Sequence, residues 1–185
     1  MHSPRISHST PIQRRASRLV TGLALAATSA IVISTLVIPN LVRADHGVPH
    51  GTILARGSFA ETTDIKIKST LGGEFRVMHI DDSADVIVQN VTIEPGAQTG
   101  WHSHHGPVVV VVAAGTMTLY QGDDPSCTGE TFTAGEVFVD PGQGNVHNAR
   151  NEGGTGVQLY ATYFDVPPGV GPAIPGTNPG TCTGF

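Results

Sequence analysis

Three histidines within four positions are the residues of this chain whose types and spacing are best suited to chemistry. They lie in the segment 101–105 (WHSHH), and a run of five valines follows at 108–112. A buried imidazole needs partners for its ring nitrogens, and a metal ion supplies one. Side chains alternate between the faces of a strand, so His102 and His104 point to one side and His105 to the other. The spacing predicts half of a metal site; the alternative is a histidine-rich surface loop before a core strand.

The valine run is typical of a strand that is buried on both faces, or of the middle of a barrel. If one regular strand continues from the histidines, Val108, Val110 and Val112 share the face of His102 and His104. Alkyl groups are then expected to line the pocket beside the imidazoles.

Two segments in order resemble the two sequence motifs of a small single-domain cupin. The first motif is Gly, five residues, His-x-His, three or four residues, Glu, six residues and Gly, and the second is Gly, five residues, Pro-x-Gly, two residues, His, three residues and Asn. The matching positions in this chain are Gly96, His102, His104, Val108 and Gly115 for the first motif, and Gly135, Pro141, Gly144, His147 and Asn151 for the second.

The chain departs from the cupin pattern at two places. Val108 stands where the family has a glutamate ligand, and one extra residue separates Pro141 from Gly144. The resemblance implies an all-β cupin jelly-roll β-barrel in which His102, His104 and His147 hold one divalent transition-metal ion. Iron, manganese, zinc, nickel and copper are not distinguished, because imidazole suits several of them.

The rest of the sequence also predicts an all-β jelly roll, because short strands recur with Gly and Pro between them and no helical period is present. A hairpin through Ala114-Gly115 is expected to join the valine strand to the strand 116–121. The barrel domain is expected over 45–165, and the Pro- and Gly-rich tail, 166–185, is expected to be extended or loosely docked, without a core face. The other expected strands are 52–59, 74–80, 85–94, 131–133, 136–140, 146–150 and 157–165.

The first 44 residues predict an export signal peptide. Four arginines precede an apolar run at 19–38, and the segment 42–44 (VRA) has the small or apolar residues that a signal peptidase reads. Cleavage after Ala44 gives a secreted or extracytoplasmic protein that begins at Asp45. The run of 20 residues is also long enough to span a bilayer. An uncleaved membrane anchor therefore stays open, as does the choice between Sec and twin-arginine export.

The net charge of the chain limits the kinds of partner that it can bind. The chain has 10 Lys and Arg against 15 Asp and Glu, and the first 44 residues contain five of the arginines and no acid. The remainder therefore carries 5 basic and 15 acidic side chains, a net charge of −10, which disfavours nucleic acid as a partner.

In an exported protein, the two cysteines Cys127 and Cys182 predict one disulfide. The alternatives are free thiols or metal ligands.

Three further residues have expected places around the site. Gln98 shares the parity of His102 and is expected to reach the pocket as a hydrogen-bond donor. Trp101 has the opposite parity and is expected to serve sheet packing or an interface. Tyr163, like the other tyrosines, is expected to pack the barrel.

Two function classes remain open for such a chain, because fold does not settle function. One is a metal-dependent enzyme, such as an oxygenase or a related lyase or isomerase. The other is a non-catalytic protein that binds a small ligand or a metal. Three neutral imidazoles leave the charge of the ion uncompensated, which favours an anionic small molecule or a hydroxide. The sequence does not decide the oligomeric state, and a homodimer is one option.

Overall fold

Strands form throughout the part of the chain that the computed structural model describes, residues 49–70 and 75–183. These residues contain no helix, and therefore none that is long and apolar enough to cross a membrane. The expected signal peptide at 1–44 lies outside the described residues. The described part belongs to one compact unit, and its strands follow the β-branched and alternating segments of the sequence.

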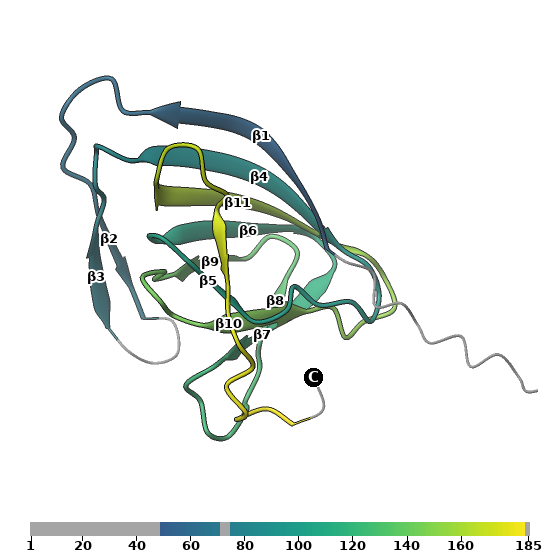
Figure 1. Cartoon of the computed structure of the whole chain (residues 1–185). Helices are drawn as coiled ribbons and strands as arrows, with labels where there is room; N and C mark the ends of the chain where they lie inside the picture. The colour runs from purple at the N-terminus through teal and green to yellow at the C-terminus, as the bar shows by residue number, and fades with distance from the viewer. Residues whose placement is uncertain (1–48, 71–74, 184–185) are drawn as a thin grey trace, which may run out of the picture. The chain divides into compact units, whose positions relative to one another are not determined.

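Two five-stranded antiparallel sheets and one small hairpin make up the fold (Figure 1). The first sheet has the order β1 (His50–Ser58), β4 (Asp85–Ile93), β11 (Val157–Val166), β6 (Val108–Ala114) and β9 (Val137–Asp140). The second has the order β12 (Ala173–Pro175), β5 (His102–His104), β10 (His147–Arg150), β7 (Thr116–Gln121) and β8 (Glu130–Thr133). The hairpin is β2 (Lys66–Ser69) with β3 (Arg76–His79). The described residues thus form an all-β, cupin-like sandwich of antiparallel sheets.

The core lies between the two large sheets and takes alternate residues from each. The inward side chains of β6 are Val108, Val110 and Val112, and those of β7 include Met117 and Leu119; all five belong to one buried cluster. Full burial of such a side chain contributes about 1.5–3 kcal/mol. The alternation of apolar residues therefore decides which face of each sheet turns inward, and the site lies on these inward faces.

Two expectations about strand connections are wrong. The strand that begins at His102 ends at His104, and β6 starts at Val108 in the other sheet, so no regular strand continues from the histidines into the valines. The valine strand also forms no hairpin with β7. Gly115, at a φ of 79°, carries the chain from one sheet to the other, so β6 pairs with β9 and β11 and β7 pairs with β8 and β10.

The C-terminal segment is docked more firmly than the sequence indicates. Its residues 173–175 form the edge strand β12, which pairs with β5 beside the histidines. All three residues of β12 are exposed, so no apolar pattern marks this strand in the sequence. Hydrogen bonding of the backbone, rather than burial of side chains, holds it in place.

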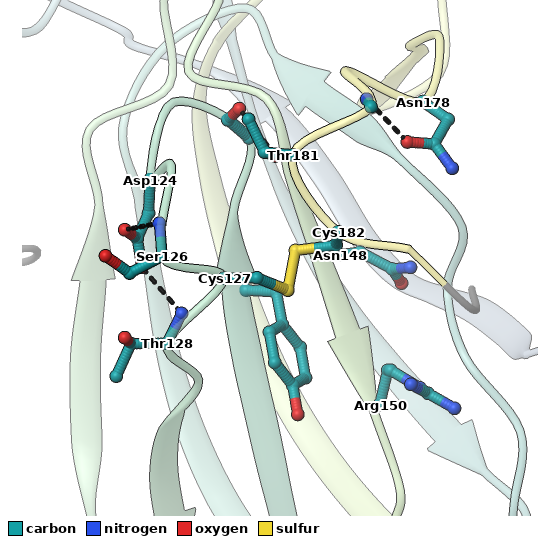
Figure 2. The surroundings of a disulfide bond; sticks show 12 residues. Asp124, Ser126, Cys127, Thr128, Asn148, Arg150, Asn178, Thr181 and Cys182 are labelled. Atoms are coloured by element: carbon teal, nitrogen blue, oxygen red, sulfur yellow. Dashed lines mark hydrogen bonds between the residues drawn. A yellow bond between two sulfur atoms is a disulfide. The ribbon is translucent and has the colours of Figure 1, made fainter.

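The disulfide between Cys127 and Cys182 is present and ties this segment to the loop after β7 (Figure 2). Asp124 shapes that loop, because its carboxylate accepts hydrogen bonds from the backbone N–H groups of Ser126 at 2.8 Å and Thr128 at 2.7 Å. Cys182 is buried, with 2% of its surface exposed. The C-terminal segment is therefore anchored both at β12 and near its end.

Candidate metal centre

Two neighbouring strands of the second sheet bring three histidines together. His102 and His104 stand at the two ends of β5 on the same face, and His147 begins β10 directly across from His102 in the antiparallel register. The ring centroids are 4.4 to 5.1 Å apart, and one nitrogen of each ring lies within 4.8 Å of the others. The segments that the cupin resemblance singles out thus converge on one cluster, whereas His105 lies outside it.

Backbone carbonyls fix the orientation of all three rings. The Nδ1 atom of His102 donates to the carbonyl of Gly100 at 2.8 Å, and that of His104 to the carbonyl of Pro172 at 2.9 Å. His147 Nδ1 makes the same kind of bond, at 3.2 Å, to the carbonyl of Asn145. A carbonyl oxygen can only accept, so each Nδ1 carries a proton and each Nε2 keeps its lone pair. This is how histidines that ligate a metal are held in proteins.

Burial keeps the three imidazoles neutral. It is the main cause that lowers the pKa of His102. Burial first, and then the neighbouring histidines, lower the pKa of His104 and of His147 to about 3, because two imidazolium charges at this spacing repel each other. Neutral imidazole is the form that binds a metal, so the site is ready at neutral pH to accept a cation.

An acid that the sequence reasoning missed lies beside the cluster. Asp140, at the end of β9, is 1% exposed, and its carboxylate oxygens lie 3.8 Å from His104 Nε2 and 3.6 Å from His147 Nδ1. Burial is the largest influence on this carboxyl and raises its pKa, against the opposing effects of His104 and the hydrogen bond from Asn145. The signal that could have found it is an acid at an inward position of the strand 137–140, two residues after Phe138.

The cluster opens onto apolar space. A small, partly open cavity of about 50 Å³ lies between the sheets, lined by the three histidines and by side chains that include Val108, Met117 and Phe138. Val108 thus lines the site as expected, but it does so from a separate strand in the other sheet and not through a strand shared with the histidines. The cavity holds only a few water-sized molecules. Its alkyl and aromatic walls keep the imidazoles largely out of water.

A wider groove of about 330 Å³ shares His102 and His104 with this cavity, and Trp101 and Gln89 also line it. Trp101, expected to serve sheet packing or an interface rather than the pocket, is thus among the residues that line the groove. Tyr163 lines both spaces and packs its ring 5.1 Å from that of His104; burial raises its pKa. Its phenol is thus held in the protonated form.

Gln98 does not take its expected role as a donor in the pocket. Its Oε1 atom accepts a hydrogen bond of 2.6 Å from Asn148 Nδ2, and its backbone forms an isolated bridge with Arg150. Asn151, the last residue of the second motif, is also structural. Its buried amide donates to the carbonyls of Ile93 at 2.9 Å and Thr155 at 2.8 Å, which ties the end of β10 to β4.

Comparison with known proteins agrees with the fold. Residues 89–163, which contain all three histidines and Asp140, match the cupin domain. No curated protein matches the sequence.

Solved structures that resemble the chain do so in part. An uncharacterized conserved protein with a double-stranded β-helix domain from Klebsiella pneumoniae is 19% identical, with a TM-score of 0.44, over 71% of this chain and 87% of that one. A cupin 2 conserved barrel domain protein from Salinispora arenicola is 26% identical, with a TM-score of 0.39, over 43% of this chain and 63% of that one. A cupin-2 domain containing protein from Shewanella frigidimarina is 22% identical, with a TM-score of 0.36, over 43% and 70%.

Proposed function

We propose that this chain is a metal-dependent cupin that acts on a small molecule, with His102, His104 and His147 as the ligands of one divalent transition-metal ion. The observation that carries the proposal is the set of three neutral imidazoles, each with Nδ1 bound to a carbonyl and Nε2 left free. The residues fit a cation, because an oxygen of the buried Asp140 carboxylate also lacks a hydrogen-bond partner there.

The surroundings favour oxygenase chemistry over hydrolysis. When bound, the ion supplies a redox or Lewis-acid centre. The apolar walls of the inner cavity exclude bulk water and leave room only for molecules of a few atoms. The outer groove, at about 330 Å³, has the volume of a small-ligand site and brings Trp101 and Gln89 next to His102. The aromatic ring can stack on a flat substrate, while the amide can orient a polar group.

The alternative is a non-catalytic protein that binds a small ligand or a metal, and the buried position of the histidines favours it in one respect. His104 and His147 are only 5% and 4% exposed, so a ligand reaches the ion through the side of His102. A site of this kind can store an ion without turning over a substrate. Oxygen consumption separates the two functions, because a binding protein consumes none.

We also propose that the protein works outside the cytoplasm. The disulfide between Cys127 and Cys182 supports this location, because such bonds persist mainly in oxidising compartments. The arginine-flanked apolar run at 19–38 supports it independently.

Metal analysis of the purified protein tests the proposal. We expect about one divalent ion per chain, with His147→Ala abolishing it and His105→Ala as the matched control that retains it, since His105 lies outside the cluster. Oxygen consumption is then measured with small carboxylic acids and phenols as probes. A wild-type chain that takes up no ion, or a His105→Ala variant that loses the ion while His147→Ala keeps it, contradicts the assignment.

A further inference from the structure

A buried acid is built into the wall of the histidine cluster from a different strand. In β9 the side chains of Phe138 and Asp140 are buried, whereas Val137 is exposed. The antiparallel register sets Asp140 directly across from Val108 of β6, and Phe138 across from Val110. Opposite residues of such a pair hold their Cβ atoms about 5 Å apart. Asp140 therefore shares the inward face on which Val108 lines the cavity.

The protein satisfies the carboxylate of Asp140 only in part, through the side chain of Asn145 and the backbone N–H of Gly142. Its Oδ1 atom accepts a hydrogen bond of 3.0 Å from Asn145 Nδ2, and this bond fixes the orientation of the group. Its Oδ2 atom is buried and has no hydrogen-bond partner among the described residues. That oxygen lies 3.8 Å from Nε2 of His104, the nitrogen that the bond to Pro172 leaves free.

No permanent cation balances this acid in the part of the chain that the structure describes. The groups of potential positive charge beside it are His104 and His147 of the cluster, and the structure brings no described Lys or Arg within ion-pair distance of it. Asp85, another buried acid, shows the contrast, because it binds the guanidinium of Arg56 at 2.6 Å. A buried charge without a partner costs several kcal/mol. The surroundings of Asp140 thus lack one positive charge.

The distances allow a shared ion to supply that charge. Nitrogen and oxygen ligands lie about 2.0–2.2 Å from a divalent transition metal, so two atoms bound to the same ion are at most about 4.3 Å apart. Oδ2 of Asp140 and Nε2 of His104, at 3.8 Å, satisfy this limit.

We propose that the Asp140 carboxylate is the anionic partner of the metal ion, so that the centre consists of three imidazoles and one acid. This inference rests on the proposed metal site. It lowers the net charge of the loaded centre from +2 to +1, and it favours a divalent ion over cuprous copper, because carboxylate is a hard donor. The acid that the first motif lacks at Val108 is thereby supplied from the adjacent strand.

The test compares metal affinity and thermal stability in the full chain. Asp140→Asn keeps the shape of the side chain and an acceptor for Asn145 but removes the charge. We expect zinc affinity to fall about 10- to 100-fold, the range for lost partners of metal ligands. The melting temperature of the metal-free variant should stay the same or rise, because an unbalanced buried charge is gone. The rise in melting temperature on adding zinc should be smaller in Asp140→Asn than in the wild type.

Two further variants sharpen the test. The double variant Val108→Glu/Asp140→Asn moves the acid from β9 to the residue directly opposite on β6. Its zinc affinity should return to within about tenfold of wild type. Asp85→Asn is the matched control, since its acid already has a cation in Arg56. It should lower the melting temperature equally with and without zinc.

The outcomes separate this inference from the metal site itself. A wild-type chain that binds no zinc refutes the proposed function. Equal zinc affinity of wild type and Asp140→Asn overturns only the role of Asp140. If Asp140→Asn does not fold, the double variant decides: zinc affinity near that of wild type supports the proposal, and a folded double variant that binds zinc weakly overturns it.

Discussion

The disulfide between Cys127 and Cys182 should stabilise the fold and also hold one side of the metal site. The segment that it anchors lies along β5, where the carbonyl of Pro172 accepts the Nδ1 hydrogen bond of His104 at 2.9 Å. The N–H of Gly176 donates to the carbonyl of Trp101 at 2.9 Å. Replacing both cysteines by serine removes the covalent anchor of this segment and leaves hydrogen bonds to hold it, among them the β12–β5 pairing and the bond from Thr181 Oγ1 to the carbonyl of Gly122 at 3.2 Å.

The size of the effect follows from the length of chain that the cross-link closes. The two cysteines are 55 residues apart, and in the chain-entropy account a loop of this length stabilises the native state by about 4 kcal/mol. A loss of that size lowers the melting temperature of a domain of this length by on the order of 10 °C. Zinc affinity should fall as well, because His104 loses its orienting partner more often.

Calorimetry of the Cys127→Ser/Cys182→Ser variant measures the first effect and zinc titration the second. Wild-type protein under reducing conditions is the matched control, and it should behave like the double variant. A melting temperature within about 2 °C of the oxidised wild type would refute the reasoning on stability. Unchanged zinc affinity in a variant of lower stability would show that β12 holds His104 without the cross-link.

Two further predictions concern the two sides of the site. Val108→Glu should place a second acid beside Asp140, so the metal-free variant should melt at a lower temperature than the wild type, and zinc should restore the melting temperature. Thermal melts with and without zinc measure this, and equal destabilisation in both conditions contradicts it. Gly142→Ala should cost several kcal/mol, because Gly142 has a φ of 63° and an added Cβ meets the backbone carbonyl of Gly106. Gly144→Ala, with a φ of 86° and open space around it, should cost only about 1 kcal/mol in denaturant unfolding, and equal losses for the two variants contradict the packing argument.

The sequence predicts the elements of the fold better than their pairing. Period-two alternation and Gly or Pro boundaries locate most strands, including 116–121, which matches β7. The sequence could not decide whether β6 and β7 pair as a hairpin, because a tight turn at Gly115 can also carry the chain from one sheet to the other. β12 is missed because its residues bury no side chain, and only backbone hydrogen bonds define it.

The site divides in the same way. Fixed spacing within two motifs is enough to select His102, His104 and His147, which the structure brings into one cluster. Asp140 is not selected by spacing, because its place depends on the register between β6 and β9, which sets it across from Val108. If the acid belongs to the centre, the site is less positive than the three histidines alone indicate. An anionic ligand is then favoured less than by three histidines alone.

Anomalous diffraction from crystals of the zinc-loaded full chain tests the central claim most directly. The account predicts one strong peak about 2.1 Å from the Nε2 atoms of His102, His104 and His147, on the side of the cluster that faces Asp140 Oδ2. A peak bound to other residues, or histidine rings without a peak between them after zinc loading, would contradict the account.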